Sequence, residues 1–278
     1  MALTPLQRRI CRLVADERKR SGESYVAGGG ALNEFLAGTR KSRDVDLFHD
    51  TEAALVATWA KDRGTLTAAG LIVETIRELP AFVEAQVRDA NETVLVQWAQ
   101  DSAYRFFPLV EHETLGLTLH PFDLATNKLL AVVGRREARD WIDVVHCHDR
   151  LQPLGYLAWA AAGKDLGFGP LDIVEEAARS TRYTQGEVDA LDFDGPAPNA
   201  GELSRRWHKA IAEAREIVRA LPEEHAGKCV LDQAGFLVKN APESLEPELR
   251  AGRVTFHEGC IRGAFPELRT GRGPGFER

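Results

Sequence analysis

Two aspartates separated by a single residue are the side chains of this sequence best suited to chemistry. Asp44 and Asp46 belong to the alternating run Asp-Val-Asp-Leu, which predicts a strand with one polar and one apolar face. Both carboxylates then point the same way, and their repulsion favours a divalent cation between them, Mg²⁺ or Mn²⁺. The pair predicts a metal site of the kind used in phosphoryl or nucleotidyl transfer, although a solvated strand face gives the same short pattern.

A glycine turn precedes the aspartates. Gly28, Gly29 and Gly30 follow the short apolar stretch 25–27 and lead into residues 31–36, which together predict a strand, a tight turn and a helix. Glycine lets backbone N–H groups approach phosphates closely, and the N-terminus of the helix attracts anions. The turn therefore indicates a phosphate-binding loop, while a plain tight turn remains the alternative for the glycines alone.

A second set of charged residues lies in segment 121–148, whose apolar residues recur at helical spacing. Lys128 on this segment is a candidate point charge for a triphosphate, and Asp140 and Asp143 share one helix face. Each of these residues alone is equally typical of a solvated helix. Together with the aspartate pair they favour a nucleotide site.

These patterns resemble those of a known superfamily. Gly29-Gly30, followed after positions 31–43 by Asp-Val-Asp-Leu, resembles the signature of the polymerase-β-type nucleotidyltransferases. More narrowly, the run Arg-x-Ser-x-Asp-Val-Asp-Leu-Phe at 40–48 and the charged positions within 123–143 resemble the abortive-infection (AbiEii-like) toxin nucleotidyltransferases. The resemblance covers about residues 20–150.

The resemblance implies both a site and an activity. The catalytic residues would be Asp44, Asp46, Lys128 and Asp143, with the metal on the first two, and the nucleotide would be held by Gly28, Gly29, Gly30, Arg40, Ser42 and Lys128. The expected reaction moves a nucleoside monophosphate from an NTP, ATP among the candidates, to a hydroxyl acceptor. An RNA 3′ end such as that of tRNA is the first expectation, with a cognate antitoxin protein as partner; small-molecule or protein acceptors stay open.

One position departs from the superfamily pattern. A third carboxylate usually comes from a later strand, but this chain has Gln97 there, and an amide is not a general base. Asp101, four residues further on, is the candidate substitute. The departure leaves open a catalytically weak or inactive nucleotide-binding regulatory protein.

The remaining pattern predicts an α+β fold, with a small mixed-sheet core and a helical C-terminal domain. We expect a nucleotidyltransferase domain at 1–150, a helical domain without strands at 151–265 and a Gly/Arg tail at 266–278. The expected helices lie at 5–20, 51–62, 154–162, 170–179, 186–191 and 201–221, and the expected strands at 71–76, 81–87 and 93–98.

Composition limits the classes of protein. The 278 residues are 44% hydrophobic, enough for an ordinary core, and the net charge of −7 excludes a general polyanion binder. Four cysteines without a CxxC pair predict reduced thiols, and no run resembles a signal peptide or a membrane span, so we expect a cytoplasmic protein with no membrane contact. The arginines of 205–219 beside Trp207 predict a solvated helix face, with an RNA-facing surface as the alternative.

Overall fold

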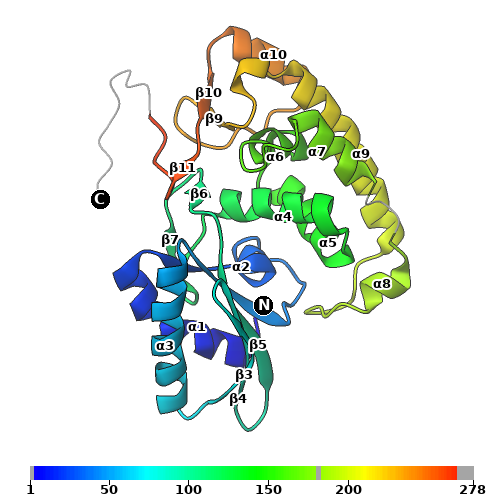
Figure 1. The fold of residues 1–278 in the computed structure, drawn as a ribbon. Coiled ribbons are helices and arrows are strands. Elements are labelled where there is room, and N and C mark those ends of the chain that lie inside the picture. Colours follow the sequence, from blue (N-terminus) through cyan, green and yellow to red (C-terminus); the bar gives the residue numbers. More distant parts are fainter. Residues whose placement is uncertain (1–2, 180–182, 268–278) are drawn as a thin grey trace.

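A seven-stranded mixed sheet forms the first half of the protein (Figure 1). The computed structural model describes residues 3–179 and 183–267. The strand order is β3-β4-β5-β2-β1-β8-β7, in which β2 runs parallel to β5 and antiparallel to β1. The strands are β1 (Ser24–Ala27), β2 (Asp44–His49), β3 (Ile72–Leu79), β4 (Phe82–Arg88), β5 (Thr93–Gln100), β7 (Val110–His112) and β8 (Gly116–Thr118).

One face of the sheet is covered by α1 (Pro5–Ser21) and α3 (Glu52–Ala68). Val45 and Leu47 on β2 are buried, whereas the alternate residues of the strand are only half-buried. The period of two predicted for this strand is therefore confirmed, and it leaves the aspartates on the face away from α1 and α3.

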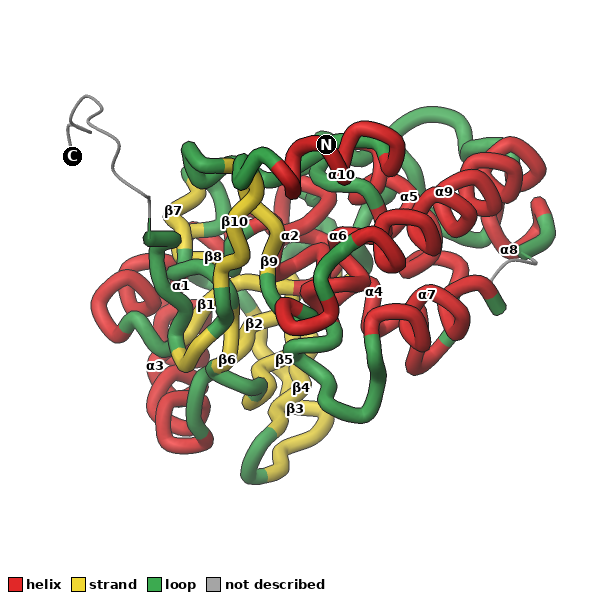
Figure 2. The backbone as a smooth tube through the Cα atoms, turned by 90° about the horizontal axis from the view of Figure 1, so that it is seen from above, coloured by secondary structure: helices red, strands yellow, loops and turns green. Residues whose placement is uncertain are grey.

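Helices dominate the second half and lie on the other side of the sheet (Figure 2). The helix α4 contacts α2 (Gly28–Phe35), which belongs to the first half with the sheet. It also contacts α6 and α7 of the helical second half, so α4 connects the two halves. All residues of α6 are buried, which makes it the centre of the helical core. The helices are α4 (Pro121–Arg135), α5 (Ala138–Arg150), α6 (Leu154–Ala161), α7 (Pro170–Ala178), α8 (Gln185–Asp189), α9 (Ala200–Ala220) and α10 (Pro242–Arg250).

The predicted α+β class is confirmed, but the expectation of no strands after residue 151 is wrong. The strand β9 (Cys229–Asp232) pairs with β10 (Val254–His257), and β11 (Cys260–Ile261) pairs with β6 (Tyr104–Arg105) in the first half. These strands have two to four residues, too few for a period of two to be recognised. The domain boundaries stay a prediction, and most of the predicted tail, 268–278, lies outside the described residues.

One cysteine and one helix differ from what the sequence predicted. Three of the four cysteines are buried free thiols, as predicted, but Cys260 is exposed. The helix predicted at 51–62 continues to Ala68, past Gly64, because Leu66 is fully buried and holds the last turn in place. None of the helices within the described ranges is both long and apolar enough to span a membrane.

A buried ion pair connects the two covering helices with the sheet. Arg18 on α1 donates from Nη2 to Oδ2 of Asp62 on α3 at 2.7 Å, and both side chains are at most 1% exposed. The indole Nε1 of Trp98 on β5 donates to the same carboxylate at 2.8 Å. Three elements therefore depend on one carboxylate.

Replacing this carboxylate should destabilise the protein strongly. Asp62→Asn leaves the Arg18 charge buried without a counter-ion, and we expect the free energy of unfolding to fall by about 3–5 kcal/mol. Urea denaturation followed by circular dichroism measures it. Lys61→Gln is the matched control: Lys61 is next to Asp62 on α3, and its pair with Glu17 on α1 is solvent-exposed, so the change should have little effect. An equal loss in both variants would show that the buried pair has no special role.

Candidate active site

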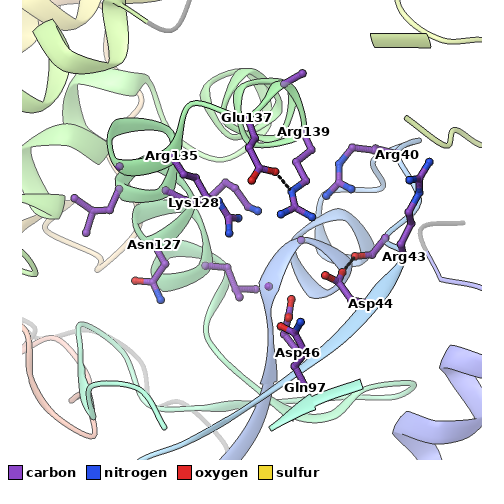
Figure 3. Close-up of a pocket in the computed structure, with 18 of the residues that line it drawn as sticks. Arg40, Arg43, Asp44, Asp46, Gln97, Asn127, Lys128, Arg135, Glu137 and Arg139 are labelled. Atoms are coloured by element: carbon purple, nitrogen blue, oxygen red, sulfur yellow. Dashed lines mark hydrogen bonds and ion pairs between the residues drawn. The ribbon is translucent and has the colours of Figure 1, made fainter. Parts of the chain in front are cut away.

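A cleft of about 1190 Å³ opens between the free face of the sheet and the helices α4 and α5 (Figure 3). One wall is formed by the glycine turn, the segment 40–44 and side chains of β2 and β5. The opposite wall is formed by α4 and by residues 136–139, which lead into α5. Every nucleotide-binding and metal-binding residue predicted from the sequence, apart from Gly30, lines this cleft.

The paired aspartates lie on the sheet wall. The hydroxyl of Ser42 donates to Oδ1 of Asp44 at 2.7 Å, while none of the described residues donates a hydrogen bond to the carboxylate of Asp46. Burial and then repulsion by Asp44 raise the pKa of Asp46 to about 7, against the opposing attraction of Lys128 and Arg139. Two carboxylates that repel each other and lack a bonded cation fit a divalent metal ion.

Among the residues that the structure describes, no third carboxylate forms a metal-holding group with this pair. Within residues 3–179 and 183–267, no group of three or more acidic, histidine or cysteine side chains is arranged to hold a metal. Gln97 is directly opposite Asp46 in the parallel pairing of β2 and β5, and its Nε2 donates to Oε1 of Glu84 at 2.9 Å. Asp101 lines the same cleft but is four residues further along, about 13 Å at the rise of a strand. The structure therefore does not bring Asp101 to the aspartates.

The glycine turn lies directly against the side chain of Asp46. The helix α2 begins at Gly28, whose φ is +71°, and a Cβ there would lie 1.7 Å from Oδ2 of Asp46. Glycine is required at this position both by its conformation and by this contact. Gly29 also lines the cleft, whereas Gly30 packs against Leu3 and Ser42. The first two glycines thus present backbone N–H groups of a helix N-terminus to the site.

Asp143 is behind the cleft wall rather than in it. The carboxylate is fully buried and accepts from Arg40 at 2.9 Å (Nε to Oδ1) and 2.7 Å (Nη2 to Oδ2). The amide of Asn33 donates to Oδ1 at 2.9 Å, and Nζ of Lys128 lies 3.4 Å from Oδ2. Burial would raise the pKa of Asp143, but Lys128 and Arg40 outweigh it and hold the pKa below its usual range.

Asn33 is a residue of this site that the sequence analysis did not identify. Its Nδ2 also donates to the carbonyl oxygen of Gly29 at 2.9 Å, so one amide connects the glycine turn with Asp143. No local pattern marks such a residue, because Asn33 and its partner are 110 positions apart. Only the fold brings them together.

A second aspartate fixes the lysine. Nζ of Lys128 donates to Oδ1 of Asp140 at 2.8 Å, and the guanidinium of Arg135 donates to both oxygens of the same carboxylate. Arg139 extends from the same wall toward the aspartate pair and bonds Glu137 (Figure 3). Cationic groups held in place thus face the carboxylates across the cleft, an arrangement suited to a polyphosphate and its metal ion.

The basic helix considered in the sequence analysis does not provide stacking. Trp207 is fully buried in α9, while Arg206 pairs with Asp149 and Arg215 with Glu175. The solvated helix face is therefore supported, and stacking of RNA bases on Trp207 is excluded, because its ring is inside the core.

Comparison with solved structures identifies the fold. MenT4, a nucleotidyltransferase toxin from Mycobacterium tuberculosis H37Rv, matches with a TM-score of 0.53 and 15% identity over 79% of this chain and 85% of that one. A protein of H. pylori to which nucleotidyltransferase activity is attributed matches with a TM-score of 0.53 and 13% identity over 78% and 96%. JHP933 from Helicobacter pylori matches with a TM-score of 0.51 and 12% identity over 78% and 95%.

No protein-family model and no curated protein sequence matches the chain. At such low identity the structural matches establish the fold and leave the reaction to be argued from the cleft. The chain has the fold of the nucleotidyltransferases, including that of a nucleotidyltransferase toxin.

Proposed function

We propose that this protein transfers a nucleoside monophosphate from an NTP to a hydroxyl acceptor. The acceptor oxygen bonds the α-phosphorus and its hydroxyl proton passes to solvent, while the bond from the α-phosphorus to the bridging oxygen breaks and pyrophosphate leaves with the electron pair. The observation that carries the proposal is the pair Asp44 and Asp46, set beside a helix N-terminus at Gly28 and opposite the fixed cation Lys128. Such a reaction needs charge neutralisation and alignment more than covalent chemistry from side chains.

Each part of the cleft has a separate task in this proposal. The backbone N–H groups of Gly28 and Gly29 bind phosphate oxygens, and Lys128 neutralises the triphosphate from the opposite wall. Ser42 fixes the orientation of Asp44 through its hydrogen bond. Mg²⁺ or Mn²⁺ held by Asp44 and Asp46 would supply positive charge at the reacting phosphate. Asp143 keeps Arg40 and Lys128 in place without touching the substrate.

An RNA 3′ end, such as that of tRNA, is the acceptor we propose to test first, with the protein acting as a toxin beside an antitoxin. The support is the similarity in fold to MenT4, which is described as a nucleotidyltransferase toxin. A small molecule or a protein is the alternative acceptor. The competing function is a nucleotide-binding regulator without turnover, which is favoured by Gln97 opposite Asp46 in place of a carboxylate.

Transfer should depend on Asp46. We expect the protein, with Mg²⁺ and α-labelled NTPs supplied singly, to label tRNA-sized material in total cellular RNA. Asp46→Asn should reduce labelling by about 10²-fold or more, because one charge of the metal site is lost. Chelation of the metal should have the same effect.

Asp16→Asn, an exposed aspartate on α1, is the matched control and should leave labelling unchanged. Labelling that persists in Asp46→Asn would contradict the assigned site. Absence of any label with a protein that still binds NTP would favour the regulator or a different class of acceptor.

Asp143 should behave as a positioning residue rather than a metal ligand. Asp143→Asn removes the counter-ion of Arg40 and Lys128, so we expect NTP affinity to fall by about 10–100-fold. Binding of Mn²⁺ without nucleotide, measured by electron paramagnetic resonance, should be unchanged in Asp143→Asn and strongly weakened in Asp46→Asn. Equal loss of Mn²⁺ binding in the two variants would show that Asp143 is itself a ligand. Circular dichroism checks that both variants are folded.

A further inference from the structure

The cleft-facing side of α4 carries one uncharged polar side chain among apolar and charged ones. Leu124, Asn127, Ala131 and Gly134 are spaced three or four residues apart and all line the cleft. Apolar walls with one placed polar group are typical of pockets that bind flat organic rings. Asn127 is therefore the residue of this stripe able to recognise a pattern of hydrogen-bonding atoms.

The orientation of this amide is fixed by Lys164. Nζ of Lys164, a side chain only 7% exposed, lies 2.7 Å from Oδ1 of Asn127 and 2.8 Å from Oδ1 of Asp123. Asp123 is itself held in place, since its two oxygens accept from the backbone N–H groups of Phe106 and Phe107 at 2.9 and 3.1 Å. An ammonium group only donates, so the amide atom that faces Lys164 must be the oxygen.

The amide nitrogen is left for a ligand. Within the described part of the chain, Nδ2 of Asn127 donates to no residue, and the side chain extends from α4 on the wall that carries Lys128 (Figure 3). The oxygen is therefore turned toward Lys164, and the N–H donors are the atoms of this side chain left for a ligand in the cleft. Asn127 and Lys128, the lysine assigned to the triphosphate, both line this cleft, so one bound nucleotide can contact both.

We propose that Asn127, oriented by Lys164, recognises the base of the incoming nucleotide by donating to a carbonyl oxygen. This inference rests on the proposed function and adds a class of substrate to it: CTP, UTP or GTP in preference to ATP. Cytosine and uracil offer O2, and guanine offers O6. Adenine has no carbonyl group, and its acceptors N1 and N7 each lie beside the N6 amino group, a second donor that an N–H group does not pair with. The amide oxygen that would accept from N6 is turned toward Lys164.

Equilibrium binding of the four NTPs, with Mg²⁺ and no acceptor, tests this preference by isothermal titration calorimetry. We expect wild-type protein to bind at least one of CTP, UTP and GTP about tenfold or more tightly than ATP. Asn127→Asp keeps the shape and the bond to Lys164 but replaces the donor by an acceptor. The preference should then disappear or reverse toward ATP, and Asn127→Ala should reduce it without reversing it.

Asn91→Asp is the matched control, because it introduces the same charge at an exposed turn between β4 and β5. Similar affinities of the wild type for all four NTPs, or a preference for ATP, would overturn the role of Asn127 while leaving the proposed reaction intact. A preference unchanged in Asn127→Asp and Asn127→Ala would also overturn it. Failure of the wild type to bind any NTP would instead refute the proposed function, and with it this inference.

Discussion

The geometry of the cleft depends on the ion pairs and the hydrogen bond made by the buried carboxylate of Asp143. A carboxylate with no exposure is stable only when it is paired and hydrogen-bonded, and here Arg40, Lys128 and Asn33 fulfil that need from three other parts of the chain. Satisfying one buried charge thereby fixes the glycine turn, the segment before β2 and α4 relative to α5. Loss of any one partner would leave part of the buried carboxylate without a hydrogen bond, so the positions of the partners depend on one another.

The residues proposed to bind the metal and the phosphates could be predicted from the sequence, but several of the contacts that hold them in place could not. The alternation of Asp44-Val45-Asp46-Leu47 correctly predicted which side chains share a face, because this period is a local property of a strand. The position of Asp143 behind the wall, the bond from Asn33 and the distance of Asp101 depend on pairings between segments far apart in the chain. The short strands β9 to β11 were missed for the same reason, since partners rather than pattern create them.

Gln97 changes the electrostatics of the cleft in a definite direction. The superfamily pattern would place a third negative charge opposite Asp46, whereas the amide here adds none. Fewer negative charges lower the affinity for a divalent cation and also lessen the repulsion that raises the pKa of Asp46. In the proposed reaction the site would therefore rely more on the nucleotide's own phosphates to retain a metal ion, a common arrangement for Mg²⁺.

The side-chain amides of Gln97 and Asn127 both line the cleft, but one is hydrogen-bonded through its nitrogen and the other through its oxygen. Gln97 donates from its nitrogen to Glu84, so its oxygen is the atom not used in that bond, and an acceptor is compatible with a cation. Asn127 gives its oxygen to Lys164, so its nitrogen is the atom left on the side of the apolar stripe. Each orientation follows from the chemistry of the partner, because a carboxylate accepts and an ammonium donates. The charged side chains of Glu84 and Lys164 thus determine which amide atoms remain available in the cleft.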